Sequence, residues 1–323
     1  MAVYTHLEND DIATLLDAYE VGELRFAVGI TQGVENSNFL LEVDGASGVT
    51  KYILTVYEKR VDANDLPFFM GLMKHLHANG VPCPLPVTRS DGEVIGTIKG
   101  KPAALITFLE GRSRSAIRNS MVAELGRGMA ELHKAGASFE MARANNLSVE
   151  GWQALYGQLA GQLNDVAPAL DALIADELAY LKQHWPDDVP QGVIHADLFP
   201  DNVFFTGEKL SGIIDFYFAC TDAYVYDIAI CLNCWCFETG GEFNLTKAKL
   251  LLNHYNKVRA LSDAERAALP IMARGAALRF LLTRAFDWVH HQPDAQVRPK
   301  DPMEYVKKLQ FHQQVTNAEH YGI

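Results

Sequence analysis

The sequence has no long apolar run, few cysteines and a deficit of positive charge. None of its apolar stretches reaches the roughly 18–20 residues that a membrane span requires. The first ten residues are polar and acidic rather than basic and then apolar, so we expect no secretory signal and a cytoplasmic protein. Lysine and arginine number 28 against 40 aspartates and glutamates, a net charge of −12 that argues against binding nucleic acid or an anionic membrane.

Only five cysteines occur, and three of them, Cys231, Cys234 and Cys236, fall within six residues. Such a cluster can hold a metal ion. However, no second Cys or His pair stands nearby at zinc-site spacing, and the segment 226–237 is apolar and helix-like. We therefore interpret the three side chains as buried, reduced thiols.

What the chain does contain is a set of polar side chains between short apolar runs, from 193 to 216. His195 and Asp197 follow one run, Asn202 stands five residues after Asp197, and Asp215 ends another run. Carboxylate and amide oxygens on loops suit phosphoryl transfer, in which one carboxylate takes the proton of the acceptor hydroxyl and other oxygens hold Mg²⁺ on nucleotide phosphates. The alternative is a pair of polar β-turns. The order His-Ala-Asp-x4-Asn, with Ile-Ile-Asp-Phe close behind, resembles kinase catalytic and metal loops and favours the first interpretation.

The N-terminal third predicts a small sheet with helices. Helices are expected at 9–19 and 62–79, and strands at 24–31, 39–43, 51–57, 94–98 and 103–108. The loop 32–38 joins two of these strands, as a nucleotide lid does in kinases, so Gly33, Asn36 and Ser37 are predicted to contact phosphates. A plain hairpin with a polar tip is the alternative.

The segment 107–111 stands where kinases have the hinge that hydrogen-bonds adenine, so Thr107 and Leu109 are predicted nucleotide contacts. We place the domain boundary there, giving domains 1–109 and 110–323. Helical periodicity then dominates, at 121–135, 148–184, 223–238, 246–260, 263–291 and 302–318. Together these elements predict an α+β, protein-kinase-like fold with two lobes. The first lobe is an antiparallel sheet with a helix, and the second is larger and mainly helical.

Several stretches narrow the resemblance to bacterial homoserine kinases of the aminoglycoside phosphotransferase and choline kinase superfamily. These stretches are Gln32–Phe39, Leu54–Lys59, Asp65–Phe69, Gly100–Gly111 and His195–Asn202. The resemblance implies ATP and Mg²⁺ as cofactors and L-homoserine as the small-molecule substrate. It also implies Asp197 as catalytic base, with Asn202 and Asp215 as metal ligands. Asp227 resembles a structural carboxylate behind the catalytic loop, although an ordinary aspartate in the first turn of a helix is an equal alternative.

One position departs from the kinase pattern. Thr55 stands where kinase-fold strands carry a lysine near the α- and β-phosphates. Lys51 and Lys59 are each four residues away, about 13 Å along a strand. Thr55 is therefore assigned to the nucleotide site, where it cannot supply the positive charge that the lysine would bring. The charge has to come from Mg²⁺ and backbone amides, or from another cation such as Lys101 or Arg112.

The sequence indicates least clearly which residues bind the phosphoryl acceptor. The carboxylate of homoserine calls for a cation, and Arg279, which has no acidic residue three or four positions away, is expected to supply it. Two other functions stay open. One is a kinase for an aminoglycoside or for choline, the latter with an aromatic cage drawn from Tyr217, Tyr224, Trp235 and Trp288. The other is a non-catalytic, nucleotide-binding pseudokinase, suggested by Thr55.

Overall fold

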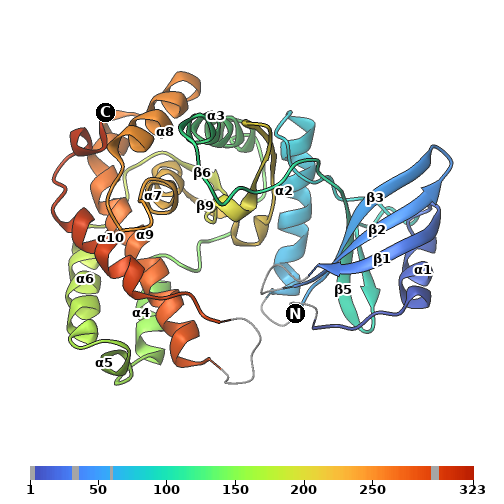
Figure 1. The fold of residues 1–323 in the computed structure, drawn as a ribbon, viewed down its shortest axis with the longest axis horizontal. Coiled ribbons are helices and arrows are strands. Elements are labelled where there is room, and N and C mark those ends of the chain that lie inside the picture. The colour runs from blue at the N-terminus through green and yellow to red at the C-terminus, as the bar shows by residue number, and fades with distance from the viewer. Residues whose placement is uncertain (1–3, 31–35, 59–60, 292–297) are drawn as a thin grey trace. The chain divides into compact units, whose positions relative to one another are not determined.

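The computed structural model describes residues 4–30, 36–58, 61–291 and 298–323, and they form two compact units (Figure 1). Unit 1 comprises Met1–Glu110 and Gly212–Tyr217, and unit 2 comprises Gly111–Ser211 and Phe218–Ile323. The short segment 212–217 therefore groups with unit 1, whereas the sequence placed it with the C-terminal part. The reason is local bonding: Ile213 N donates to Pro82 O at 2.8 Å, and the Tyr217 and Tyr57 hydroxyls lie 3.1 Å apart.

Unit 1 is built on a five-stranded antiparallel sheet with the order β1-β2-β3-β5-β4. The strands occupy the segments that the sequence predicted. Their bounds are Glu23–Ile30 (β1), Ser37–Gly45 (β2), Gly48–Val56 (β3), Ile95–Ile98 (β4) and Lys101–Thr107 (β5). The β2–β3 hairpin closes where Gly45 pairs with Gly48, and Gly48 has a φ of +100°, which only glycine adopts readily.

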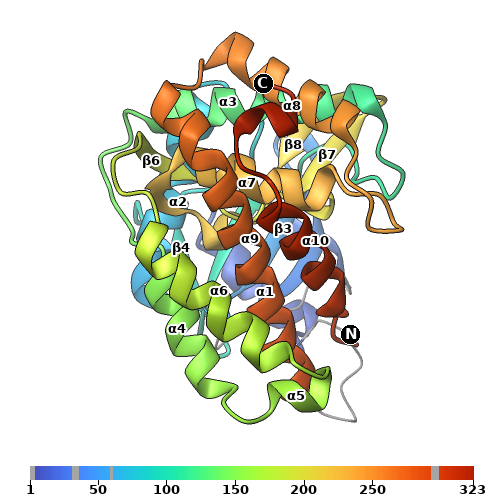
Figure 2. The ribbon, with the colours of Figure 1, turned by 90° about the vertical axis from the view of Figure 1, so that its left-hand side faces the viewer.

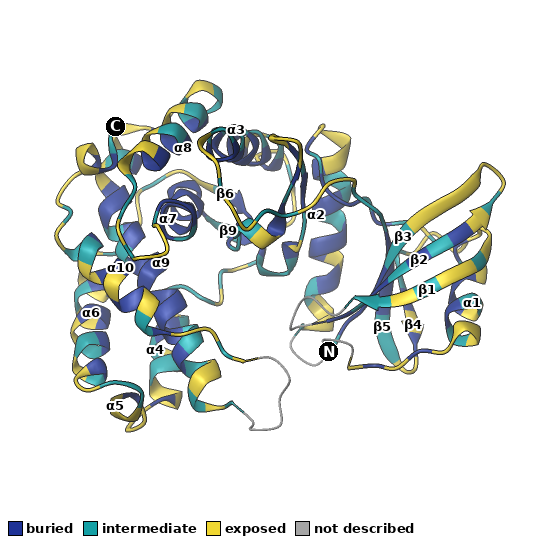
Figure 3. Cartoon of the chain, in the orientation of Figure 1, coloured by how far each residue is buried: buried dark blue, intermediate teal, exposed yellow. Residues whose placement is uncertain are grey.

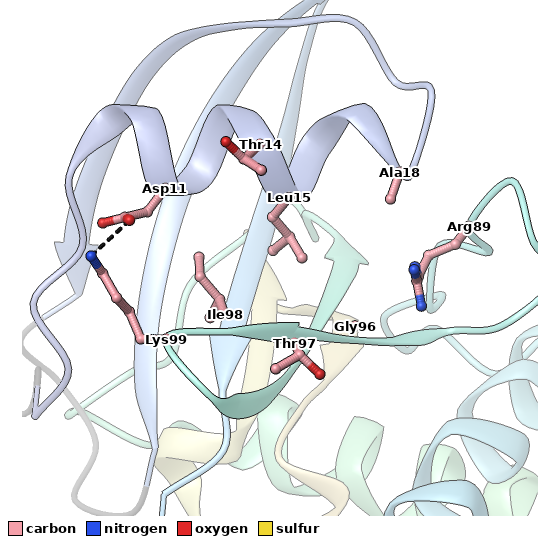
Figure 4. Close-up of a pocket in the computed structure, with 9 residues that line it drawn as sticks. All are labelled: Asp11, Thr14, Leu15, Ala18, Arg89, Gly96, Thr97, Ile98 and Lys99. Carbon is pink, nitrogen blue, oxygen red and sulfur yellow. Dashed lines mark ion pairs between the residues drawn. The ribbon is translucent and has the colours of Figure 1, made fainter.

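Helix α1 (Asn9–Asp17) covers one face of this sheet with an amphipathic stripe. Ile12, Leu15 and Leu16 are buried against alternate strand residues, namely Phe39, Leu41, Val43, Leu54 and Val56. Figure 4 shows Leu15 above Gly96, where an added Cβ would come within 3.0 Å of the leucine. A hollow of about 320 Å³ lies beside this contact, and an ion pair of 2.7 Å joins Asp11 to Lys99 there. None of the predicted site residues lines it.

The second helix of unit 1 starts later than the sequence predicted. Residues Ala63–Asp65 form a 3₁₀ turn (η1), and α2 runs from Leu66 to Ala78. Pro67 stands in the first turn, where its missing N–H costs no helical hydrogen bond. Asn79 and Gly80 follow the helix, and Gly80 has a φ of +81°.

Unit 2 is mainly helical, as expected. Its helices are α3 (Asn119–Gly136), α4 (Val149–Gln158), α5 (Leu163–Val166), α6 (Leu170–His184), α7 (Tyr224–Trp235), α8 (Leu245–Val258), α9 (Asp263–Val289) and α10 (Met303–Gln313). Strand β6 (Gln191–Ile194) pairs antiparallel with β9 (Cys220–Ala223), and β7 (Val203–Thr206) pairs with β8 (Lys209–Ile213). Helices α4 and α6 both pack on α9 (Figure 2). No helix in the described parts of the chain is both long and apolar enough to cross a membrane.

The helix-rich section predicted over 148–184 is divided into separate helices. The section contains three helices, α4, α5 and α6. Gly161 and Ala169 interrupt it, with φ values of +80° and +62°, which lie outside the right-handed helical region. Pro168 precedes Ala169 and also disfavours a continuous helix.

Helix α7 forms the centre of unit 2. Eleven of its twelve residues are buried, and it is dark along its length in Figure 3. Its sequence is apolar nearly all round, which is typical of a helix surrounded by protein. Cys231 and Cys236 are buried, Cys234 is partly buried, and none forms a disulfide. Burial raises the pKa of the Cys231 and Cys236 thiols well above its usual value. Inside this helix the one charged side chain is Asp227.

Candidate active site

The segment 195–202 forms a tight loop between β6 and β7, and its conformation is strained. Ala196 has a φ of +61°, in the left-handed region that non-glycine residues rarely adopt. Such strain persists only where surrounding contacts hold it, and it is concentrated at functional sites. Residues Pro200–Asn202 form a 3₁₀ turn (η2) that returns the chain to β7.

Within this loop, Asn202 fixes the carboxylate of Asp197. The Asn202 side-chain amide nitrogen donates to Asp197 Oδ2 at 3.0 Å and to the Asp197 backbone oxygen at 2.8 Å. Asp197 is half-buried and Asn202 is 8% exposed. The amide oxygen of Asn202 makes no hydrogen bond to a described residue and can serve as a ligand. The two residues that the sequence singled out, Asp197 and Asn202, are therefore hydrogen-bonded to each other.

The side chain of Asp227 accepts hydrogen bonds from the backbone of this loop. One of its oxygens accepts from His195 N at 2.9 Å, and the other accepts from Ala196 N at 2.8 Å. The first oxygen also contacts His133 Nε2 at 3.1 Å, and His133 Nδ1 contacts the Tyr255 hydroxyl at 2.8 Å. Burial alone would raise the pKa of Asp227, but the hydrogen bond and charge of His133 outweigh it and lower the pKa below its usual value. Asp227 is therefore a structural carboxylate and not merely a first-turn aspartate.

Arg279, the predicted carboxylate anchor, lies under the same loop. It is only 2% exposed, and its Nη1 donates to Ala196 O at 2.5 Å. Its guanidinium also stacks against the rings of Phe218 and Phe280, at 5.5 and 4.6 Å. Ala196 is thus held on its N–H side by Asp227 and on its carbonyl side by Arg279. This geometry favours a positioning role for Arg279, and its assignment as the anchor of a substrate carboxylate stays a prediction.

Replacing Arg279 by Met should therefore lower kcat more than it raises either KM. The Ala196 carbonyl would be left buried without its partner, at a cost of about 1–3 kcal/mol of stability or loop order. We expect kcat to fall at least roughly tenfold with both KM values within about twofold. Arg279→Lys keeps a donor and should recover much of the loss. A selective rise in the KM of the acceptor would instead restore the sequence-based assignment.

Asp215, the second predicted metal ligand, belongs to unit 1. It follows β8, its side chain is exposed, and its φ is +66°. Ala196 and Asp215 are two of only five described non-glycine residues with positive φ, and each stands in one of the two motif loops. Burial is the main cause that raises the pKa of the Tyr217 hydroxyl to about 12, and the charge of Asp215 contributes in the same direction. A carboxylate held in this conformation at a strand end is suited to ligate a metal ion.

The residues predicted at the phosphate lid form a bonded cluster in unit 1. Ser37 is 0% exposed, and its hydroxyl donates to Glu58 Oε1 at 2.7 Å and accepts from Thr5 N at 3.0 Å. Asn36 is 5% exposed and accepts from Glu58 N at 3.2 Å. Gly33 lies outside the described residues. The Ser37 hydroxyl and the Asn36 amide oxygen are thus engaged within unit 1, and contacts of these two residues with a nucleotide stay a prediction.

Glu58 also binds Lys101, one of the cations considered in place of the missing strand lysine. Lys101 Nζ pairs with Glu58 Oε2 and donates to Thr5 Oγ1 at 2.7 Å. Thr55 is 2% exposed on the sheet face opposite the α1 core, where its hydroxyl donates to Asn38 Oδ1 at 2.7 Å. The sequence did not reveal the role of Glu58, because its partners come from three separate segments. Arg112, the other cation considered, is exposed in unit 2 and pairs through its backbone with Phe205.

The two predicted hinge residues differ in their bonding. Thr107 N donates to Leu85 O, and the Thr107 hydroxyl accepts from Leu85 N, each at 2.9 Å. The backbone N–H and the hydroxyl of Thr107 are thus hydrogen-bonded to Leu85, in the segment that precedes β4. Leu109 is half-buried and follows the last residue of β5 by two positions.

The aromatic residues considered as a choline cage each have another environment. Trp235 is 1% exposed and donates from Nε1 to Leu198 O at 2.6 Å, whereas Trp288 is 45% exposed near the end of α9. Tyr224 packs against His133 and Arg259. Tyr217 contacts Tyr57 and Phe69 in unit 1. The four aromatic side chains thus have the separate contacts of core or surface residues.

Comparisons with known proteins identify relatives of this chain. Residues 27–261 match the phosphotransferase enzyme family. A homoserine kinase of Xanthobacter autotrophicus is 57% identical over 323 residues, which cover 100% of this chain and 99% of that protein. A homoserine kinase of Bradyrhizobium diazoefficiens is 56% identical, with coverage of 100% and 98%.

Solved structures agree on the fold. Amicoumacin kinase hAmiN, in complex with AMP-PNP, Ca²⁺ and Ami, superposes with a TM-score of 0.71 at 17% identity and coverage of 95% and 94%. Spectinomycin phosphotransferase APH(9)-Ia, in complex with ADP and spectinomycin, gives a TM-score of 0.68 at 14% identity and 98% coverage of both chains. The predicted two-part α+β kinase-like fold is confirmed.

Proposed function

Because the chain belongs to the phosphotransferase enzyme family, we propose that it transfers the γ-phosphoryl group of ATP to the side-chain hydroxyl of L-homoserine, forming O-phospho-L-homoserine. The observation that carries this proposal is the identity of 57% with a homoserine kinase along the full length of both chains. The reaction would belong to threonine biosynthesis. Its enzyme class, a kinase acting on an alcohol, follows from the family and its relatives.

In this reaction Asp197 is the general base. Its carboxylate is oriented by the Asn202 amide, so it can accept a hydrogen bond from the acceptor hydroxyl and take its proton as the phosphoryl group arrives. The loop that carries Asp197 is held rigid by Asp227 and Arg279, which act on the backbone of Ala196. Preorganisation of this kind lowers the barrier because the base needs no rearrangement during the reaction.

Asn202 and Asp215 are the residues that would hold Mg²⁺. The amide oxygen of Asn202 is left available because its nitrogen serves Asp197, and Asp215 presents an exposed carboxylate. Bound Mg²⁺ supplies charge neutralisation on the nucleotide phosphates. In unit 1, Lys101 is a candidate cation for the nucleotide phosphates, and the predicted nucleotide contacts there are Asn36, Ser37, Thr55, Thr107 and Leu109.

Removal of either metal ligand should raise the Mg²⁺ concentration that gives half-maximal rate. We expect Asp215→Ala to have the larger effect, because it removes a charged ligand, and Asn202→Ala to lower kcat as well, because it releases Asp197. The rate is measured at saturating ATP while Mg²⁺ is varied. An unchanged Mg²⁺ dependence in Asp215→Ala would show that the metal is held by other groups.

A substrate panel tests the proposed function directly. The purified protein is given Mg·ATP with L-homoserine, choline or kanamycin, and ADP release is followed. We expect turnover with L-homoserine to exceed the others by a factor of at least about 10³, since a site built for one set of polar groups rejects ligands that lack them. No ADP release with any acceptor, together with ATP binding, would favour the pseudokinase interpretation, and release that does not depend on an acceptor would show ATP hydrolysis instead of phosphoryl transfer to L-homoserine.

A further inference from the structure

Unit 2 contains a cavity of about 900 Å³ that the site described so far does not use. Its walls come from five separate places: the segment 114–117, the turn η2, the end of α7 with the residues after it, Lys247 of α8, and the start of α10 with Asp301 before it. Its size is typical of a small-molecule site.

The cavity adjoins the loop that carries Asp197. Pro200 of that loop lines it directly. Two other lining residues, Cys234 and Trp235, hold the backbone oxygen of Leu198, at 3.5 Å from the sulfur and 2.6 Å from the indole nitrogen. Leu198 follows Asp197 directly. The cavity wall is therefore bonded to the residue next to the proposed base.

Most charges of the cavity wall are already paired. Lys247 bonds Glu238 at 2.8 Å, and Glu304 is shared between Lys308 at 2.5 Å and Arg284 at 2.6 Å. Lys307 is exposed to solvent. Three charged lining residues have no ion pair among the described residues, namely Lys307, Asp301 and Arg114, and of the two cations Arg114 is the partly buried one.

Arg114 and Asp301 have unused hydrogen-bonding capacity. Arg114 makes one long hydrogen bond, from Nη2 to Gly207 O at 3.4 Å, and its Nε is buried without a partner in the described chain. An arginine with free donors is suited to bind a carboxylate in a two-point contact. Asp301 accepts from Met303 N through Oδ1 at 2.8 Å, and its other oxygen makes no hydrogen bond to a described residue.

We propose that this cavity binds the acceptor as a zwitterionic α-amino acid with a side-chain hydroxyl, Arg114 pairing with its carboxylate and Asp301 with its ammonium group. This assignment rests on the proposed function and identifies the part of the protein that selects an amino acid. The cavity exceeds the volume of one homoserine, so selection has to come from the two charges rather than from fit.

Analogues of homoserine test each charge separately. 4-Hydroxybutanoate lacks the ammonium group and 3-aminopropan-1-ol lacks the carboxylate. Both are measured as competitors of L-homoserine in the wild type, Arg114→Gln and Asp301→Asn, with Lys307→Gln as the control from the same wall. We expect Arg114→Gln to raise the KM of L-homoserine and the Ki of 4-hydroxybutanoate by about 10–100-fold, the loss of one charge-assisted pair. The Ki of 3-aminopropan-1-ol should stay within about twofold.

Asp301→Asn should show the mirror image, with the Ki of 3-aminopropan-1-ol raised and that of 4-hydroxybutanoate unchanged. Asparagine keeps the oxygen that caps Met303, so α10 should remain intact. Lys307→Gln should leave all constants within about twofold. Equal changes for both analogues, or none in Arg114→Gln, would overturn this cavity assignment while turnover of L-homoserine by the wild type still upheld the proposed function. No turnover of L-homoserine by the wild type would overturn both.

Discussion

Asp197→Asn should lower kcat by a factor of about 10²–10⁴, the range over which a positioned general base contributes. The amide keeps the shape of the side chain but cannot take the proton of the acceptor hydroxyl. The KM for ATP should change little, since the proposed contacts of Asp197 are with the acceptor and Asn202. The measurement is steady-state kinetics with both substrates varied.

Asp201 offers a matched control for this prediction. It stands four residues further along the same loop and is exposed. Asp201→Asn removes the same charge from the same segment and should retain most of the wild-type kcat. If Asp197→Asn kept more than about a tenth of the wild-type kcat, the base would have to be another group.

Asp227→Asn should destabilise the protein by about 3–5 kcal/mol, the cost of breaking a buried, hydrogen-bonded charge pair. The carboxylate accepts from two consecutive backbone N–H groups and from His133, and an amide replaces one acceptor oxygen by a donor. The same change should lower kcat, because the loop would lose its support at Ala196. Urea unfolding at pH 7 measures the first effect and kinetics the second.

The pH dependence of stability gives an independent check on Asp227. Its pKa in the folded protein lies below the usual value, so its contribution is complete above about pH 4, the ordinary pKa of an aspartate. That contribution is lost as the pH falls below 4 and through the folded pKa. The difference in unfolding free energy between wild type and Asp227→Asn should therefore shrink below pH 4.

Asp263→Asn is the control that distinguishes the predicted effect of Asp227→Asn on stability from a general effect of aspartates in the first turn of a helix. It lies in the first turn of α9 and is exposed, whereas Asp227 lies in the first turn of α7 and is fully buried. Asp263→Asn should cost no more than about 0.3–1 kcal/mol, the value of a charge at a helix N-terminus. A similar small cost for Asp227→Asn would return that residue to the plain helix-start interpretation.

The sequence by itself determined which segments become strands and helices and which loop carries the polar motif. Alternation in β2 and the helical stripe of α1 follow from side chains within a few residues of one another, so a local pattern reveals them. The spacing of Asp197 and Asn202 is also local, and the structure joins these two side chains directly. Within the helix-rich section 148–184 the sequence did not give the bounds of the three helices. Gly161 weakens a helix without forbidding it, and Ala169, which has a φ of +62°, is by itself a strong helix former.

Only the tertiary structure decided what the buried polar residues do. Asp227 and Arg279 meet Ala196 from 31 and 83 residues away, and Ser37 and Lys101 meet at Glu58 from 21 and 43 residues away. A sequence shows that a charged side chain among apolar neighbours needs a partner, but any polar group in the chain can fill that need. Which one does so is set by the packing of elements distant in sequence, and for Arg279 that partner was the backbone of the loop that carries Asp197.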